Sequence, residues 1–132
     1  MFAQFTGRAL LASALVAGSL LAGASAVGAT SSDPSMLHLS TETGNVVKRE
    51  QTVLTCHPAG GPHKNAVRAC ADLEKAHGNV QAISAPTRAC TLEYRPVTAT
   101  MTGTWKGRNV EFTQTYENPC VLETRTGAVF DF

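Results

Sequence analysis

The stretch Thr98–Tyr116, TATMTGTWKGRNVEFTQTY, decides the fold of this chain. In its first half, threonine occupies every even position from 98 to 104, and mostly apolar residues occupy the odd positions. In its second half, Val110, Phe112 and Tyr116 alternate with polar residues. The segment Lys106–Asn109 between the halves contains a glycine and is typical of a turn. Two segments of period two around such a turn predict a β-hairpin with one buried face.

Three further segments are expected to add strands to this hairpin. They are Ser35–Ser40, Gln51–Cys56 and the short segment Ala128–Phe130. A loop with two prolines and two glycines follows from Cys56 to Lys64. The predicted fold class is α+β, with an antiparallel sheet of about five strands and one main and one short helix on one face.

The main helix is expected at Asn65–His77. Asn65 can cap its start, and Gly78 stands where a left-handed stop residue belongs. A short second helical turn is expected at Val80–Ser84. The apolar face of the main helix is predicted to consist of Ala66, Val67, Cys70, Leu73 and Ala76.

The first 26 residues have the layout of a secretory signal peptide. Arg8 precedes an uncharged apolar run from Ala9 to Ala22, and Ala24–Ala26 fits a cleavage site of small residues. The apolar run is short for a membrane span, so a retained membrane anchor is the less favoured alternative. We therefore expect residues 1–26 to be removed, residues 27–34 to form a flexible arm, and residues 35–132 to form one secreted, extracellular domain without membrane contact.

Charge and cysteine content narrow the class of protein. Cleavage removes Arg8 and no acidic residue, so ten of the 11 basic residues remain to balance the ten acidic ones. No basic stripe is present, so nucleic-acid binding is not expected. The cysteines are Cys56, Cys70, Cys90 and Cys120, and an even number in a small exported domain indicates two disulfides with three possible pairings.

No spacing in the sequence indicates an enzyme or a metal site. His57 and His63 lie in the Pro/Gly-rich loop at a separation that fits no recognised ligand pattern, so we expect solvent-exposed loop histidines there. No serine lies in a G-x-S-x-G elbow, no cysteine is left over as a nucleophile, and zinc-type spacing is absent. We expect a protein that is not an enzyme and that holds no cofactor and no metal.

The segment Ala89–Pro96, ACTLEYRP, is the candidate functional site. A cysteine begins it and Pro96 ends it, which limits its backbone freedom. Leu92 is a large apolar residue among polar neighbours. The alternative is that Leu92 is a core residue of a strand that leads into the hairpin.

Five segments spread over the predicted mature chain form one family pattern: Thr52–Cys56, Ala69–Leu73, Gly103–Gly107, Asn118–Cys120 and Gly127–Phe132. Through these segments the chain resembles the Streptomyces subtilisin inhibitor family. The resemblance implies a five-stranded antiparallel sheet with two helices, disulfides Cys56–Cys70 and Cys90–Cys120, and a homodimer formed through the sheets. It also implies a scissile bond two residues after the third cysteine, which is Leu92–Glu93 here.

A second, local resemblance concerns Ala89–Pro96 alone. These residues resemble the reactive loop of avian ovomucoid third domains, which are Kazal inhibitors. The Kazal framework needs six cysteines, so the resemblance does not extend to the fold. The loop departs from the commoner subtilisin-inhibitor pattern at Thr91, where proline is frequent, and at Glu93, where a β-branched residue is frequent. Natural convergence and an engineered graft would both produce this loop.

The resemblances imply a secreted standard-mechanism inhibitor of subtilisin-like and chymotrypsin-like serine proteases. Thr91 and Glu93 are expected to hydrogen-bond across the reactive bond, and Asn118 and Pro96 are expected to support the loop. A non-inhibitory secreted binding module on the same scaffold is the alternative, and a small secreted hydrolase is a more distant one. The residues expected to contact the protease are Ala89, Cys90, Thr91, Leu92, Glu93, Tyr94 and Arg95.

Overall fold

The hairpin predicted around the Lys106–Asn109 turn is confirmed. It forms strands β3 (Val97–Trp105) and β4 (Arg108–Tyr116), with Met101 opposite Phe112 in the antiparallel register. Both of these side chains are buried, whereas the threonine positions lie on the opposite face of the sheet. The alternation of apolar and threonine residues therefore indicates a sheet with one face in the core and one face in solvent.

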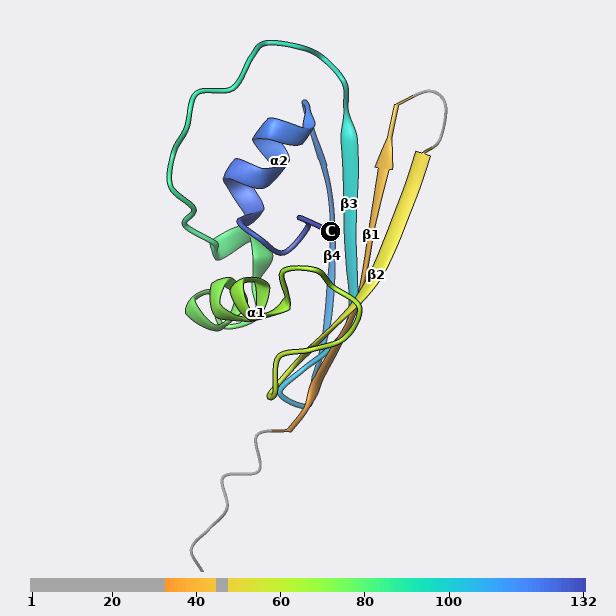
Figure 1. Cartoon of the computed structure of the whole chain (residues 1–132), viewed down its shortest axis with the longest axis vertical. Coiled ribbons are helices and arrows are strands. Elements are labelled where there is room, and N and C mark those ends of the chain that lie inside the picture. Colours follow the sequence, from red (N-terminus) through yellow and green to blue (C-terminus); the bar gives the residue numbers. More distant parts are fainter. Residues whose placement is uncertain (1–32, 45–47) are drawn as a thin grey trace, which may run out of the picture.

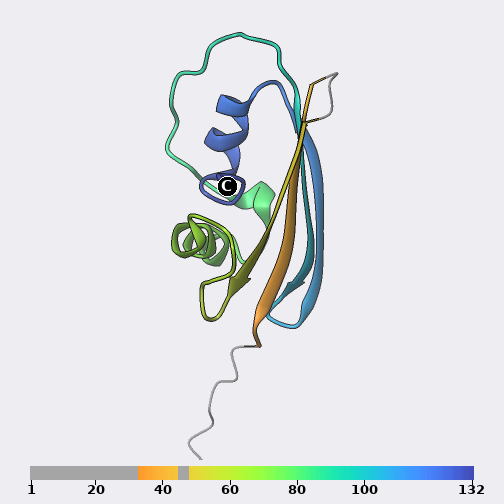
Figure 2. The ribbon, with the colours of Figure 1, turned by 45° about the vertical axis from the view of Figure 1, so that its right-hand side comes forward.

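The computed structural model describes residues 33–44 and 48–132, so the predicted signal peptide and most of the predicted arm lie outside the described residues. Strand β1 (Ser35–Thr43) pairs with both β2 (Lys48–Cys56) and β3, and the sheet order is β2-β1-β3-β4. All neighbouring strands are antiparallel. The predicted class, α+β with an antiparallel sheet, is confirmed, and the helices cover one face of the sheet (Figures 1 and 2).

The sheet has four strands in the described part of the chain, not five. The segment Ala128–Phe130, which was predicted as a strand, forms a turn. All three of its side chains are buried, and Phe130 packs against Phe112 with a ring-centroid distance of 6.0 Å. The run of apolar residues thus reflects burial in the core without strand pairing.

Helix α1 (Ala66–Lys75) is shorter than predicted. Gly78 has φ +79°, which confirms the left-handed stop. Asn65 occupies the N-cap position, but its side chain does not cap the helix. Its amide nitrogen instead donates to the carbonyl oxygen of Asp131 at 3.1 Å and to Oδ2 of the same residue at 2.7 Å. The predicted apolar face was wrong at Val67, which is 74% exposed.

Helix α2 (Pro119–Thr126) was not predicted. Asn118 is its N-cap and Pro119 begins its first turn, a position where the missing N–H of proline has no helical partner to lose. Leu122 and Thr126 are its buried residues. The short helix expected at Val80–Ser84 is a single 3-10 turn, η1 (Val80–Ala82).

The histidines of the Pro/Gly-rich loop are not solvent-exposed as predicted. His63 is 4% exposed, its Nε2 donates to the Val129 carbonyl at 2.9 Å, and its Nδ1 accepts from the Asn65 N–H at 3.0 Å. A loop that fastens the C-terminal segment needs buried donors and acceptors, and the imidazole supplies one of each.

His57 is half-buried and links three elements. Its Nδ1 lies 3.2 Å from the Ser35 hydroxyl, and its Nε2 lies 2.9 Å from Oε2 of Glu74 on α1. Glu74 also accepts from the ammonium of Lys106 in the β3–β4 turn. These hydrogen bonds lower the pKa of Glu74, the Lys106 bond contributing most and the His57 bond next.

Two disulfides complete the frame. They join Cys56 to Cys70 and Cys90 to Cys120, as the family resemblance implied. The first fastens β2 to α1, and the second fastens the long connection before β3 to α2. Within residues 33–44 and 48–132, no helix has the length and apolar character to span a membrane.

Candidate functional site

The connection between η1 and β3 is a long exposed loop. It arches over one end of the molecule, with α2 beneath it (Figures 1 and 2). Leu92 lies on this arch and is 99% exposed, and Tyr94 is 80% exposed. The alternative that Leu92 is a core residue was therefore wrong. Leu92 and Tyr94 are two large apolar side chains exposed within three residues of each other, so the loop is the candidate contact surface.

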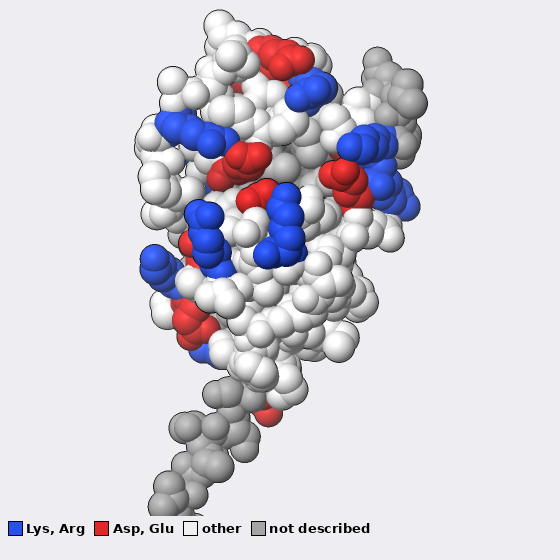
Figure 3. Space-filling model, in the orientation of Figure 1, with Lys and Arg blue, Asp and Glu red and all other residues white. Residues whose placement is uncertain are grey.

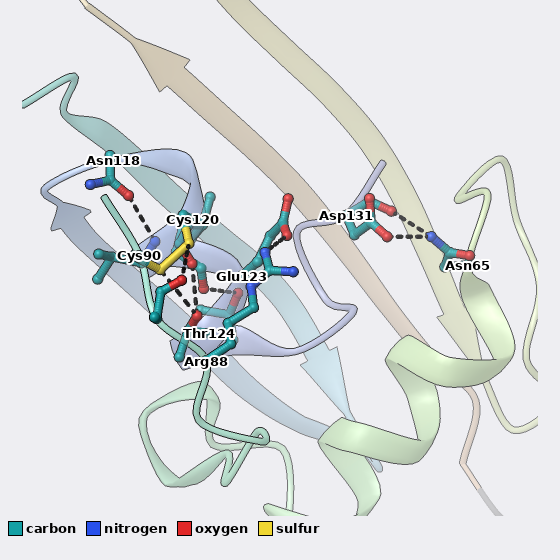
Figure 4. Close-up of polar contacts among 12 residues, drawn as sticks. Asn65, Arg88, Cys90, Asn118, Cys120, Glu123, Thr124 and Asp131 are labelled. Carbon is teal, nitrogen blue, oxygen red and sulfur yellow. Dashed lines mark hydrogen bonds and ion pairs between the residues drawn. A yellow bond between two sulfur atoms is a disulfide. The ribbon is translucent and has the colours of Figure 1, made fainter. Parts of the chain in front are cut away.

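The Cys90–Cys120 disulfide fastens the loop two residues before Leu92. Its Cα atoms are 5.7 Å apart, and Cys120 lies in the first turn of α2. Figure 4 shows this disulfide beside Asn118, Glu123 and Thr124, all from α2 or its cap. One short helix therefore provides the base on which this part of the loop rests.

Asn118 fastens the loop on both sides of the Leu92–Glu93 bond. Its Nδ2 donates to the carbonyl oxygen of Thr91 at 3.1 Å and to the carbonyl oxygen of Glu93 at 2.9 Å. Its Oδ1 accepts from the Val121 N–H at 2.9 Å, which caps α2. Because the oxygen must face the helix, the nitrogen must face the loop, and the residue is only 3% exposed.

Three outer contacts fasten the two arms of the loop. The Arg95 N–H donates to the Glu117 carbonyl at 2.9 Å, and the Gly44 N–H donates to the Pro96 carbonyl at 3.2 Å. On the other arm, the guanidinium of Arg88 pairs with the Glu123 carboxylate (Figure 4). Pro96 lies where the loop meets β3, and its role as a supporting residue stays a prediction.

The hydrogen bond expected between the side chains of Thr91 and Glu93 is not formed among the described residues. Both side chains are exposed, and both residues are held through their backbone carbonyls by Asn118. Asn118 was named from the sequence as a loop-supporting residue, and its amide bonds to the Thr91 and Glu93 carbonyls are compatible with that prediction. Sequence reasoning missed the contact of Arg88 with Glu123 on α2 and that of Arg95 with Glu117 just before the helix cap, because that helix was not predicted.

The charges around the loop are mixed in sign. Lysine, arginine, aspartate and glutamate side chains are interspersed on the face in Figure 3. No group of three or more His, Cys, Asp or Glu side chains in the described part of the chain is arranged to hold a metal ion. The two resolved pKa shifts lie outside the loop: the pKa of Glu74 is lowered, and burial raises the pKa of Tyr116. The site is distinguished by its exposed, arched loop and by the disulfide and hydrogen bonds that fix this loop to α2.

A loop that presents one apolar side chain while its backbone is fixed on both sides defines a class of protein. Such a loop offers an extended segment to a protease with little ordering left to do on binding, which is the property of substrate-like protease inhibitors.

Comparisons with known proteins agree with this class. Residues 33–118 match the model of the family described as subtilisin inhibitor-like. The chain is 37% identical over 106 residues to subtilisin inhibitor-like protein 1 of Streptomyces cacaoi, a match that covers 75% of this chain and 96% of that protein. It is 42% identical over 94 residues to a subtilase-type protease inhibitor of Streptomyces fradiae, a match that covers 69% of this chain and 66% of that protein.

A solved structure is also similar. It is the crystal structure of Streptomyces caespitosus sermetstatin in complex with Bacillus licheniformis subtilisin, with a TM-score of 0.61 and 28% identity, and the match covers 75% of this chain and 99% of that chain. The chain described here belongs to the subtilisin inhibitor-like family. The local resemblance of Ala89–Pro96 to Kazal loops stays a prediction.

Proposed function

We propose that this chain is a secreted standard-mechanism serine protease inhibitor whose reactive bond is Leu92–Glu93. The observation that carries the proposal is the pairing of a 99% exposed Leu92 with one buried amide, Asn118, that holds the carbonyl on each side of it. The solved relative in complex with subtilisin supports the same type of partner. The targets are extracellular proteases of the subtilisin and chymotrypsin type, and the chain itself has no catalytic activity.

The specificity follows from Leu92. A serine protease binds its substrate as an extended strand and places one side chain in a pocket beside the attacked carbonyl. Leucine fits the broad apolar pocket of subtilisin-like and chymotrypsin-like enzymes. It offers no charge to the carboxylate at the base of a trypsin pocket. The neighbouring residues Ala89–Thr91 and Glu93–Arg95 supply the rest of the contact strand.

The resistance of the reactive bond to hydrolysis follows from the hydrogen bonds and the disulfide that hold the loop. The protease serine attacks the Leu92 carbonyl, the oxyanion is stabilised, and the bond to the Glu93 nitrogen breaks. The new amine cannot leave, because Asn118 holds the Glu93 carbonyl and Arg95 is bonded to Glu117. The acyl side is held by the Cys90–Cys120 disulfide. The amine therefore stays at high effective concentration, and resynthesis of the bond competes with hydrolysis.

Substitutions at Leu92 test the proposal. Burying a leucine side chain is worth about 1.5–3 kcal/mol, so Leu92→Ala should weaken subtilisin inhibition by at least about tenfold. Leu92→Lys should redirect the inhibitor to trypsin, and Leu92→Asp should damage inhibition of both enzymes because it buries an unpaired charge. The thermal midpoint should stay close to wild type in all three, since the side chain makes no core contacts.

The same titration separates the alternative functions. Stoichiometric loss of subtilisin activity supports an inhibitor, unchanged activity supports a non-inhibitory binding module, and cleavage of a peptide without added protease supports a hydrolase. A Leu92→Ala variant with unchanged inhibition constants would show that the reactive bond lies elsewhere.

A homodimer through the outer face of the sheet is part of the proposal. That face carries the exposed side chains of Met36 and His38 on β1, Thr102 on β3 and Glu111 on β4. The helices cover the other face, so this is the broad surface open to a second copy (Figure 2). Sedimentation equilibrium at micromolar concentration should give about twice the mass of the mature chain. A monomer under those conditions would remove the dimer and leave the inhibitor role intact.

A further inference from the structure

Arg88 lies in a stretch of exposed loop without regular backbone hydrogen bonding. From Ser84 to Ala89 the loop forms no helix or strand, and no backbone–backbone hydrogen bond involves these residues. Every residue from Pro86 to Ala89 is exposed. A groove of about 540 Å³ separates this stretch from α2 and is lined by residues that include Ile83, Thr87 and Val121. The groove leaves open space beside the Arg88–Ala89 bond, so this stretch can adopt the extended form that a protease needs.

Each of the other basic residues of the described chain precedes proline, is fixed by side-chain contacts, or lies in a helix, a strand or the β3–β4 turn. Arg95 precedes Pro96, and a proline after the cleaved bond blocks trypsin-like enzymes. Lys64 lies between two residues fixed to the C-terminal segment, His63 and Asn65, and pairs with Asp131. The remaining basic residues lie in helices, strands or the tight β3–β4 turn: Lys48, Arg49, Arg68, Lys75, Lys106, Arg108 and Arg125.

The two disulfides do not span the Arg88–Ala89 bond. Cys56–Cys70 lies wholly before it and Cys90–Cys120 wholly after it. A cut at Leu92–Glu93 falls inside the second disulfide loop and leaves one covalent molecule. A cut four residues earlier separates β1, β2 and α1 from β3, β4 and α2. The halves are then held only by noncovalent contacts, chiefly the pairing of β1 with β3.

We propose that Arg88–Ala89 is a cleavage site for arginine-specific serine proteases and that cutting there leaves two halves without a covalent link. Water adds across the bond, giving the carboxylate of Arg88 and the amine of Ala89. The ion pair of Arg88 with Glu123 opposes cleavage only weakly, because the two side chains are 57% and 46% exposed. The site lies outside the reactive bond and does not depend on the proposed inhibitor role.

Limited digestion with trypsin tests this proposal on the purified full-length mature protein. Wild type should yield a first fragment that begins Ala-Cys-Thr-Leu-Glu, and the two halves should separate on a denaturing gel without reductant. Arg88→Gln should survive at least about tenfold longer, whereas the matched variant Arg125→Gln, which alters an arginine within α2, should be cut like wild type. Glu123→Gln frees the guanidinium and should be cut up to about fivefold faster, the factor that corresponds to ~1 kcal/mol.

Three results would overturn the proposal: a first cut at another residue, equal survival of wild type and Arg88→Gln, or halves that stay joined without reductant. The fragment pattern is read without any inhibition assay. Failure of the proposed inhibitor function would therefore leave this result unchanged, and the reverse also holds.

Discussion

Asn118 has two separable tasks, and substitutions can divide them. Its oxygen caps α2, and its nitrogen holds the carbonyls of Thr91 and Glu93. Asn118→Ser keeps a good cap acceptor but is too short to reach the loop. Asn118→Ala removes both functions. Comparing the two variants with wild type therefore measures the loop contacts and the cap independently.

The structure sets the expected magnitudes. On loss of Asn118 Nδ2, the two loop carbonyls turn to water, so each hydrogen bond is worth the low end of its usual range, about 0.7 kcal/mol. Two bonds give ~1.4 kcal/mol, a factor of about ten. Asn118→Ser should therefore weaken subtilisin inhibition about tenfold and speed cleavage of Leu92–Glu93 by a similar factor. Asn118→Ala should show the same loop defect and lose about 1 kcal/mol more stability, which lowers the thermal midpoint by roughly a further 4–8 °C.

The assay combines inhibition constants, the rate at which subtilisin cuts the loop, and thermal unfolding. A Ser variant that binds and resists cleavage like wild type would refute the claim that the amide holds the loop. Equal thermal midpoints for Ser and Ala would refute the claim that residue 118 caps α2.

Four other changes have defined outcomes. Removing the Cys90–Cys120 disulfide should lower the free energy of unfolding by roughly 3–4 kcal/mol and turn the inhibitor into a substrate. Removing Cys56–Cys70 should lower it by ~3 kcal/mol and leave the loop inhibitory. Unfolding and inhibition assays measure both effects. Glu74→Gln should reduce the loss of folding stability at acid pH. Because the pKa of Glu74 is lowered in the folded state, its carboxylate stabilises the fold fully above the ordinary pKa of 4.5, and this stabilisation is lost as pH falls through the folded-state pKa. A Gln variant that loses stability at acid pH as steeply as wild type would contradict this. Gly78→Ala should lower the thermal midpoint by more than Gly44→Ala, since both glycines have positive φ but only at position 78 would the added carbon lie 2.5 Å from the Trp105 ring.

The sheet was predictable because the alternation of apolar and polar residues lies within each strand. The hairpin of β3 and β4 follows from alternation, and the stop at Gly78 follows from the need for positive φ. Helix α2 was missed for a physical reason: its sequence PCVLETRT holds several poor helix formers and little apolar periodicity. Its stability comes from the Asn118 cap, the disulfide and burial of Leu122, none of which a periodicity test detects.

The candidate site was predictable only in part. The position of Leu92 and the disulfide pairing came from the family resemblance, whereas the three possible pairings stayed open from residue spacing alone. The contacts that fix the loop join residues between 22 and 52 positions apart, such as Arg95 with Glu117 and Gly44 with Pro96. Long-range pairs of this kind have no local pattern. The burial of His63 was missed for the same reason, since its partner Val129 lies 66 residues away.

The hydrogen-bonded chain Ser35–His57–Glu74 has a consequence for how functional sites are recognised. A hydroxyl, an imidazole and a carboxylate follow one another at 3.2 Å and 2.9 Å, which is the connectivity of a hydrolase triad. The ring is reversed relative to the serine proteases, with Nδ1 toward the hydroxyl, and Ser35 is 1% exposed and already accepts the Lys106 N–H. A search that matches three side chains by distance alone would select Ser35, His57 and Glu74, although these residues only link β1, the loop after β2 and α1. A search that also requires solvent access at the nucleophile would reject them, because the Ser35 hydroxyl is buried.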